Sequence, residues 1–162
     1  MALEIREATA ADAGLILEFI RALAEYERLL DECIATEELL RESLFGDAPA
    51  AQVVLALIGD EPAGFALWFR NYSTFLARPG IHLEDLFVLP AFRGRGIGRM
   101  LLEHLAQTAA SRGYGRLEWA VLDWNVDAIR FYESLGATPM GDWTTYRLTG
   151  AALAALAKGR AS

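Results

Sequence analysis

A glycine-rich stretch is the first feature of this sequence that could carry chemistry. Residues 93–98 read RGRGIG and lie between a predicted strand and a predicted helix. Backbone N–H groups and the positive end of a helix dipole favour an anion at such a junction, and glycines let a phosphate approach the main chain. Arg93 and Arg95 add charged donors. The stretch therefore predicts a site for a phosphate or pyrophosphate group.

Two common nucleotide motifs do not fit this stretch. A P-loop has Lys followed by Ser or Thr after its last glycine, whereas Arg99 and Met100 follow Gly98. A dinucleotide fingerprint has the spacing G-x-G-x-x-G, and its third glycine would fall on Arg99. A tight exposed turn without a ligand is the alternative that these residues alone leave open.

Two adjacent carboxylates form the second candidate site. Glu84 and Asp85 lie in the predicted strand Ile81–Val88, where alternation sends neighbouring side chains to opposite faces. Only one of the two is therefore expected to face a reacting group, for which it would act as a general base. A solvated charge at a strand edge is the alternative for Glu84.

An Asn and a Tyr lie seven residues apart in the predicted helix 125–135. Seven residues make nearly two helical turns, so Asn125 and Tyr132 are expected to share a face. A phenol has an ordinary pKa of about 10 and can donate a proton to a leaving group. The alternatives are that Tyr132 packs in the core and that Asn125 only caps the helix.

Hydrophobic periodicity and turn residues predict the elements that must position these side chains. Strands are expected at 3–7, 51–58, 63–71, 81–88, 116–122 and 144–148. Helices are expected at 9–28, 36–46, 97–112, 125–135 and 151–158. The order of the elements before the last helix, β-α-α-β-β-β-α-β-α-β, predicts a single α/β domain over residues 1–162. The glycine-rich stretch then joins the fourth strand to the third helix.

Composition limits the class of protein. The chain has 162 residues, 54% of them hydrophobic, and a net charge of −7, which argues for a globular domain and against nucleic-acid binding. Its longest aliphatic run, Val53–Ile58, is far shorter than the about 20 residues of a membrane span. The one cysteine, Cys33, fits a reducing cytoplasm. His82 and His104 lack partners at metal-ligand spacing, so no metal is expected.

Taken together, these motifs resemble the GNAT family of acetyltransferases. The stretch Val88–Gly98 is similar to the acetyl-CoA signature of that family, R/Q-x-x-G-x-G/A, with Arg93 at its first position. Five further segments resemble the branch of spermidine/spermine and thialysine acetyltransferases: residues 6–12, 23–27, 83–88, 120–125 and 131–137. The resemblance covers the chain from about residue 3 to residue 157.

The resemblance implies a mixed central sheet of about six to seven strands flanked by helices, with acetyl-CoA between splayed fourth and fifth strands. Main-chain groups of Leu86–Val88 would pair with pantetheine, and one amide would polarise the acetyl carbonyl. Amides from Gly94 to Arg99 would hold the pyrophosphate. The residues expected to bind the cofactor are Leu86, Phe87, Val88, Arg93, Gly94, Arg95, Gly96, Ile97, Gly98, Arg99, Asn125 and Ala128.

For catalysis, the resemblance implies that Glu84 binds the amine and accepts its proton through water, and that Tyr132 is the general acid for the leaving thiolate. The residues expected to bind the acceptor are Tyr26, Glu27, Glu84, Glu118, Trp119 and Ala120.

Two loops depart from the sequences of the polyamine enzymes. Ser73 and Phe75 replace an acid and a Trp, and residues 141–143 read GDW where those enzymes have Glu-Glu-Gly-Trp. A shorter diamine or a thialysine-like amino acid is therefore at least as plausible an acceptor as spermine.

The expected activity is acetyl-CoA-dependent transfer of an acetyl group to a small primary amine by a cytoplasmic homodimer. A sensor module that binds acyl-CoA without turnover is one alternative, although Glu84 and Tyr132 together favour an enzyme. An acetyltransferase of protein N-termini or lysines is the other.

Overall fold

The structure is a computed structural model that describes residues 2–159. Contacts within the chain divide it into two compact units, Met1–Leu122 and Asp123–Ser162. The two units are not placed relative to one another, so each is described by itself. None of the helices formed by residues 2–159 combines the length and apolar composition needed to cross a membrane.

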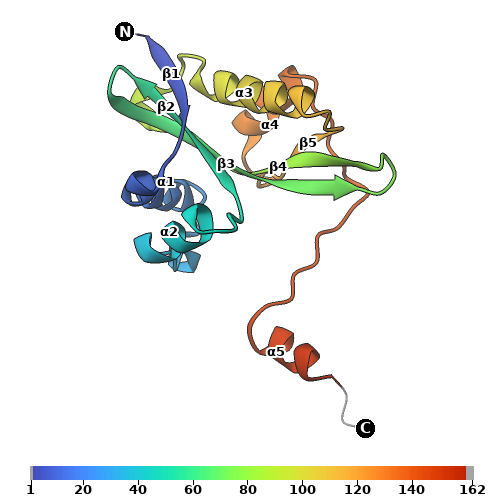
Figure 1. The fold of residues 1–162 in the computed structure, drawn as a ribbon. Coiled ribbons are helices and arrows are strands. Elements are labelled where there is room, and N and C mark those ends of the chain that lie inside the picture. The colour runs from blue at the N-terminus through green and yellow to red at the C-terminus, as the bar shows by residue number, and fades with distance from the viewer. Residues whose placement is uncertain (1, 160–162) are drawn as a thin grey trace. The chain divides into compact units, whose positions relative to one another are not determined.

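The first unit is built on a five-stranded mixed sheet with the order β1-β2-β3-β4-β5 (Figure 1). The strands are β1 (Leu3–Glu7), β2 (Gln52–Ile58), β3 (Glu61–Ser73), β4 (Arg78–Val88) and β5 (Leu117–Trp119). The first four pair antiparallel in chain order, as expected for strands joined by hairpins. β5 then runs parallel to β4 after a helical crossover.

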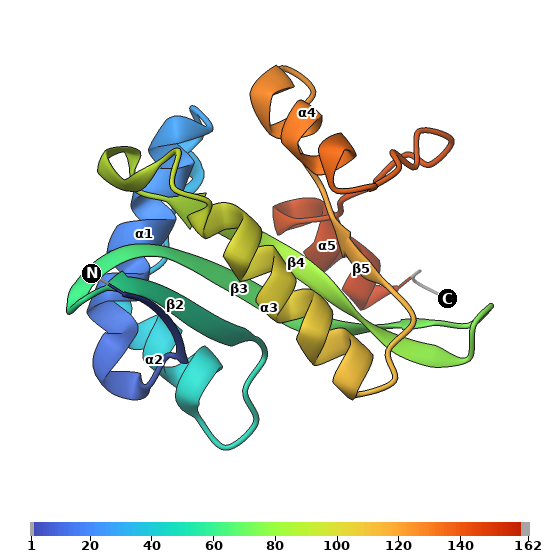
Figure 2. The same ribbon diagram turned by 90° about the horizontal axis from the view of Figure 1, so that it is seen from above.

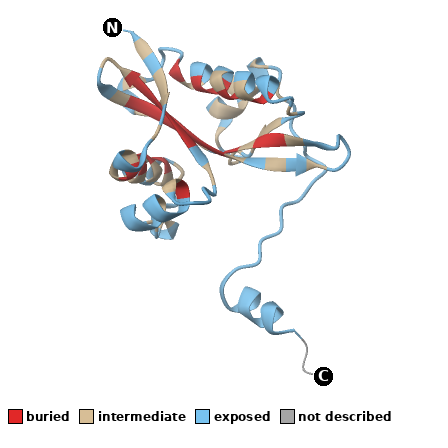
Figure 3. Ribbon diagram, in the orientation of Figure 1, coloured by how far each residue is buried: buried red, intermediate tan, exposed pale blue. Residues whose placement is uncertain are grey.

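Helices cover both faces of this sheet (Figure 2). α1 (Ala13–Tyr26) and α2 (Glu37–Phe45) lie on one face, and α3 (Ile97–Ser111) lies on the other. Apolar residues of α1 pack on alternate residues of β2 and β3, and the Phe19 ring stacks on Phe65 with centroids 5.2 Å apart. The buried residues accordingly follow the sheet and the inward stripes of α1 and α3 (Figure 3).

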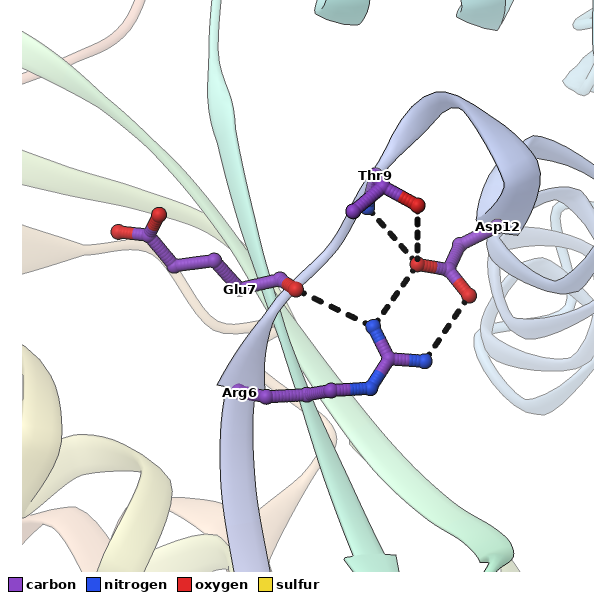
Figure 4. Close-up of polar contacts among 4 residues, drawn as sticks. All are labelled: Arg6, Glu7, Thr9 and Asp12. Atoms are coloured by element: carbon purple, nitrogen blue, oxygen red, sulfur yellow. Dashed lines mark hydrogen bonds and ion pairs between the residues drawn. The ribbon is translucent and has the colours of Figure 1, made fainter.

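Short polar contacts define where the first helices begin. The Asp12 carboxylate accepts a hydrogen bond from the Thr9 amide at 2.8 Å, in the 3-10 turn η1 (Ala10–Asp12) that leads into α1. The Arg6 guanidinium also donates to both oxygens of Asp12, at 2.9 and 3.0 Å, and lowers the pKa of Asp12 (Figure 4). At α2, the Thr36 hydroxyl accepts from the Leu39 amide and so caps the helix, which was predicted to begin at this residue.

The second unit contains α4 (Val126–Ser134) and α5 (Gly150–Lys158). The Asn125 side chain caps α4 by accepting from the Ala128 amide at 3.3 Å. Gly136 follows α4 with φ of +91°, a conformation that glycine adopts more easily than other residues. The bounds of α4 were therefore predictable from local signals.

The sheet departs from the prediction at its far edge. Six to seven strands were expected, whereas the described residues form five: 120–122 and 144–148 are not strands. A strand is stable only where a neighbour receives its hydrogen bonds, and no strand of residues 2–159 pairs with these segments. The β3–β4 hairpin is longer than expected, because Tyr72 pairs with Pro79 and Ser73 with Arg78, which leaves only 74–77 as the loop.

Candidate active site

A β-bulge at Glu84 shapes the candidate active site. Leu83 lies opposite Trp68 of β3, and Asp85 lies opposite the preceding residue, Leu67. Glu84 is therefore the extra residue of β4, with no partner on β3. The register of the two strands shifts at this point, so the strict alternation expected for Glu84 and Asp85 is interrupted.

The bulge turns both carboxylates toward the same layer. Residues opposite each other in antiparallel strands share a face, so Asp85 faces the α1 and α2 layer together with Leu67. His82, opposite Phe69, lies on this face too, and its Nε2 is 3.7 Å from Oε2 of Glu84. The two side chains therefore do not point to opposite faces as regular alternation predicts, because that prediction assumed an unbroken strand.

Three carboxylates interact at this place, and we call Glu27, Glu84 and Asp85 the carboxylate cluster. Glu27 is the C-cap residue of α1. Burial, followed by the charges of Glu84 and Glu27, raises the pKa of Asp85 to about 7. Burial and the charge of Glu84 also raise the pKa of Glu27. The cluster favours a bound cation, and Asp85 can gain or lose a proton near neutral pH.

One side of β4 is open directly after the cluster. β4 pairs with β5 only from Ile81 to Leu83, whereas β4 continues to Val88. Within residues 2–159, no strand pairs with Glu84–Val88 on that side, so the fourth and fifth strands separate there. Main-chain groups on this side of β4 are positioned to pair with an extended ligand. The side chain of Phe87, in contrast, is buried in the core.

The glycine turn follows the open edge. After the 3-10 turn η3 (Pro90–Phe92), Gly94 and Gly96 have φ of +78° and +79°, and Gly96 caps α3. A Cβ added to either glycine would meet nothing within 4 Å, so the main chain is accessible from outside. The first amides of α3 have no acceptor within the helix. These features favour an anion bound by the backbone.

The arginine side chains of the turn are engaged within the first unit. Arg93 Nε donates to the Val88 carbonyl at 3.0 Å. The guanidinium of Arg95 lies 5.4 Å from the centroid of the Phe92 ring, and Arg99 pairs with Glu103 at 2.9 Å. The backbone therefore provides the geometry for anion binding, and the arginine side chains, which were also expected to act as donors, make contacts within the unit.

The residues expected to bind the acceptor divide between two places in the first unit. Tyr26 and Glu27 lie at the end of α1, next to the cluster, and the Tyr26 ring is 6.2 Å from the Phe87 ring. Glu118 and Trp119 lie in β5, and Ala120 follows it. Glu118 lies beside His82 in register and accepts a hydrogen bond from Asn71 at 3.4 Å. Glu118 is thus held on the sheet next to the point where β4 and β5 separate.

Asn125, Ala128 and Tyr132 belong to the second unit. Asn125 uses its side-chain oxygen to cap α4, so the capping alternative for this residue is correct at least as one of its roles. The Tyr132 ring lies 5.6 Å from the Phe131 ring, and its backbone carbonyl accepts from Leu135 at the end of the helix. The catalytic roles of Asn125 and Tyr132 stay predictions.

Sequence reasoning missed two features of the site. One is the contribution of Asp85 to the carboxylate cluster, and the other is the hydrogen bond from Arg93 to β4. Neither has a local signal, because a bulge depends on the pairing of two strands and the direction of a long side chain depends on its neighbours in space. The run of two acids inside an apolar strand was the only available hint.

Comparison with known proteins agrees with this geometry. Residues 17–137 match the model of the acetyltransferase (GNAT) family. The chain is 40% identical to a thialysine N-epsilon-acetyltransferase from Bos taurus, over 94% of this chain and 96% of that protein. It is 34% identical to an L-ornithine N5-acetyltransferase from Arabidopsis thaliana, over 95% of this chain and 87% of that one.

Among solved structures, an integron cassette protein from the mobile metagenome of V. cholerae superposes with a TM-score of 0.83 at 28% identity, over 98% of this chain and 99% of that one. An aminoglycoside acetyltransferase from a soil metagenomic sample shares the fold with a TM-score of 0.76 at 20% identity, over 91% of this chain and 95% of that one. The sheet, the glycine turn and these matches lead to one conclusion: the chain belongs to the GNAT family and is an N-acetyltransferase.

Proposed function

We propose that the protein transfers an acetyl group from acetyl-CoA directly to a small primary amine, with a thialysine-like amino acid or a short diamine as the preferred acceptor. One observation carries this proposal. Six residues of β4, Leu83–Val88, contain both Glu84 and Asp85 at the bulge and the open strand edge that leads to the glycine turn. A cation and an extended anionic ligand would thus meet on a single strand.

Two features of the first unit support binding of acetyl-CoA. The open edge of Leu86–Val88 suits the amides of pantetheine, and the backbone from Gly94 to Arg99 suits the pyrophosphate. When bound, acetyl-CoA supplies the acetyl group as an activated thioester. A main-chain amide of β4 would stabilise negative charge on the acetyl oxygen. Asn125 and Ala128 would complete the cofactor site.

The carboxylate cluster would bind the amine. An alkylammonium group has an ordinary pKa of about 10.4, so it arrives charged and must lose a proton before it can attack. Three carboxylates at the end of α1 and on β4 attract the charged form. Tyr26 would border this site, and Glu118, Trp119 and Ala120 would line the approach to it along β5.

Glu84 is the proposed general base. As the bulged residue it leaves the hydrogen-bonding pattern with β3, and its carboxylate reaches into the cluster from the edge of the strand. It would take the proton from the amine through one water molecule. Tyr132 is the proposed general acid, which would give a proton to the leaving sulfur.

The shape of the β3–β4 hairpin supports an acceptor shorter than spermine. Ser73 ends β3 and its hydroxyl accepts from the Leu76 amide at 3.2 Å, so it is used to close the loop. Phe75 in this loop is 92% exposed. Neither residue offers the negative charge that a long polycation would need. The named relatives act on thialysine and ornithine, which are amino acids with one terminal amine.

We also propose that residues 1–162 form one acetyltransferase domain that works as a homodimer in the cytoplasm. These proposals rest on the resemblance to the family. Light scattering of the purified protein tests the dimer, because a mass near twice 17.8 kDa is expected.

Thiol release from acetyl-CoA tests the proposed function. The acceptor panel contains thialysine, ornithine, lysine, putrescine, spermidine, spermine and a lysine-containing peptide. We expect the highest kcat/KM with one of the amino acids or with putrescine. Activity with the peptide alone would support the protein acetyltransferase alternative. CoA binding by calorimetry without release on any acceptor would support the sensor alternative.

A further inference from the structure

The Arg93 side chain leaves the glycine turn and joins α1 to β4. Its Nε donates to the Val88 carbonyl at 3.0 Å. Its Cζ lies 5.0 Å from the centroid of the Tyr26 ring and 5.3 Å from that of Phe87, within the range of a cation–π contact. We call these four residues, Arg93, Val88, Tyr26 and Phe87, the Arg93 contact.

The Arg93 contact connects three parts of the proposed active site. Tyr26 is the last residue of α1, and Glu27 of the carboxylate cluster follows it directly. Val88 is the last residue of the open edge of β4, and Arg93 itself begins the glycine turn. One side chain therefore links the acceptor side of the site with the start of the cofactor side.

The Arg93 contact joins β4 to the end of α1, at the point where the chain leaves the helix. Arg28, which follows Glu27, has φ of +62°, so the chain turns sharply out of the helix there. The Leu29 amide then donates a hydrogen bond to the Ala24 carbonyl at 2.8 Å. This bond holds the turn to its own helix, and the Arg93 guanidinium, which lies against both the Tyr26 and Phe87 rings, adds a contact between the end of α1 and β4.

Arginine is well suited to this role. Its planar guanidinium can stack on aromatic rings and use Nε for a hydrogen bond at the same time. Lysine keeps the charge but has neither the plane nor the Nε donor. A Lys at this position would therefore keep the electrostatics of the turn and lose the geometry of the contact.

We propose that Arg93 is a positioning residue for the amine acceptor: through Tyr26 it holds Glu27 at the carboxylate cluster. The inference rests on the proposed function, because the cluster is taken as the amine site. Arg93 itself touches neither the amine nor the reacting atoms. Loss of the contact should therefore weaken amine binding more than it slows the chemical step.

The variant Arg93→Lys tests this role with steady-state kinetics and calorimetry. We expect KM for the best amine to rise about tenfold, kcat to change less than KM, and Kd for CoA to stay within about threefold. Arg112→Lys is the matched control, because Arg112 lies 5.4 Å from the centroid of the Trp68 ring and is the C-cap residue of α3. The control changes a cation–π contact that does not involve α1 or the glycine turn, so it should leave KM unchanged.

A double-mutant cycle with Tyr26→Leu asks whether Arg93 acts through Tyr26. We expect the double variant to raise KM no more than Tyr26→Leu alone, since both changes break the same contact. Additive effects on KM would overturn the proposal. So would an unchanged KM in Arg93→Lys, or a tenfold loss of CoA affinity with a normal KM, which would assign the side chain to the cofactor.

The same kinetics separate the two levels of inference. If the wild-type protein turns over no amine of the panel, the proposed function fails, and the role of Arg93 in amine binding fails with it. If the wild-type protein is active and Arg93→Lys has a normal KM, only the role of Arg93 fails. Circular dichroism of each variant verifies that the protein is folded.

Discussion

Leu83 and Asp85 are two residues apart in β4 and yet face opposite sides of the sheet. Leu83 lies opposite Trp68, whereas Asp85 lies opposite Leu67, because Glu84 is inserted as a bulge between them. In a regular strand, residues two apart share a face. The bulge thus directs Asp85 to the α1 layer, where it meets Glu27, and frees Glu84 from pairing with β3.

The proposed general base gives the first prediction. Glu84→Gln keeps the shape of the side chain but cannot accept the proton of the amine, so kcat/KM should fall about 10²-fold at pH 7.5. The deficit should shrink toward pH 10, where more of the amine is already neutral. Thiol release across this pH range measures both effects. Glu42→Gln on the exposed side of α2 is the control, and equal activity of the two variants would exclude Glu84 as the base.

Asp85 should make the stability of the fold depend on pH. Because the folded-state pKa of Asp85 is raised to about 7, from about 3.8 in the unfolded chain, the folded state binds a proton more tightly. The contribution of Asp85 to the free energy of unfolding should therefore be greatest below about pH 4 and should fall as the pH rises toward 7. About three pKa units correspond to at most about 4 kcal/mol in the free energy of unfolding.

The variant Asp85→Asn isolates this contribution. It removes the charge and keeps the size of the side chain, so it should be more stable than the wild type above pH 7 and lose this part of the pH dependence. Urea unfolding at intervals from pH 5 to pH 8.5 provides the measurement. If the free energy of unfolding changed with pH in the same way in both proteins, Asp85 would not titrate in this range.

The glycine turn should be sensitive to a single methyl group. Gly96 has φ of +79° and an accessible main chain, so Gly96→Ala strains the backbone and places a methyl group where the pyrophosphate is proposed to bind. We expect Kd for CoA to rise about tenfold, as measured by calorimetry. Gly113→Ala introduces the same strain at φ of +70°, at the other end of α3, and should leave Kd unchanged. Equal affinities of both variants would place the anion elsewhere.

Tyr132 gives a prediction for the chemical step. Tyr132→Phe removes only the phenolic proton, and turnover should fall about 10²-fold or more while CoA affinity is kept. The control is Tyr146→Phe, since the Tyr146 side chain is 93% exposed in the same unit. Turnover near the wild-type level in Tyr132→Phe would remove this residue from the mechanism.

The β3–β4 loop allows a test of the fold itself. Ala77 has φ of +53°, a left-handed conformation that costs an L residue roughly 1 kcal/mol. Ala77→Gly should therefore raise the free energy of unfolding by about 0.5 to 1 kcal/mol. In α3, where the conformation is helical, Ala106→Gly should lower it by about as much. Thermal unfolding of both variants tests whether the two changes in the free energy of unfolding have opposite signs.

The sequence by itself determined the features that depend on neighbours in the chain. Helices were predicted to begin at Thr36 and Asn125, and each of these residues caps its helix through a bond to a residue three positions later. The turn between β4 and α3 was predictable for the same reason, because its glycines lie close together in the chain. The resemblance to the acetyltransferases also held, since it rests on short segments in a fixed order.

Only the tertiary structure decided the features that depend on pairing between distant segments. The bulge at Glu84 exists because β4 shifts its register against β3, and segment 144–148 is not a strand because no strand pairs with it in the described part of the chain. The direction of Arg93 likewise depends on Tyr26, which is 67 positions earlier in the sequence. Hydrogen bonds and ring contacts across such separations form only when the chain has folded, and no local pattern records them.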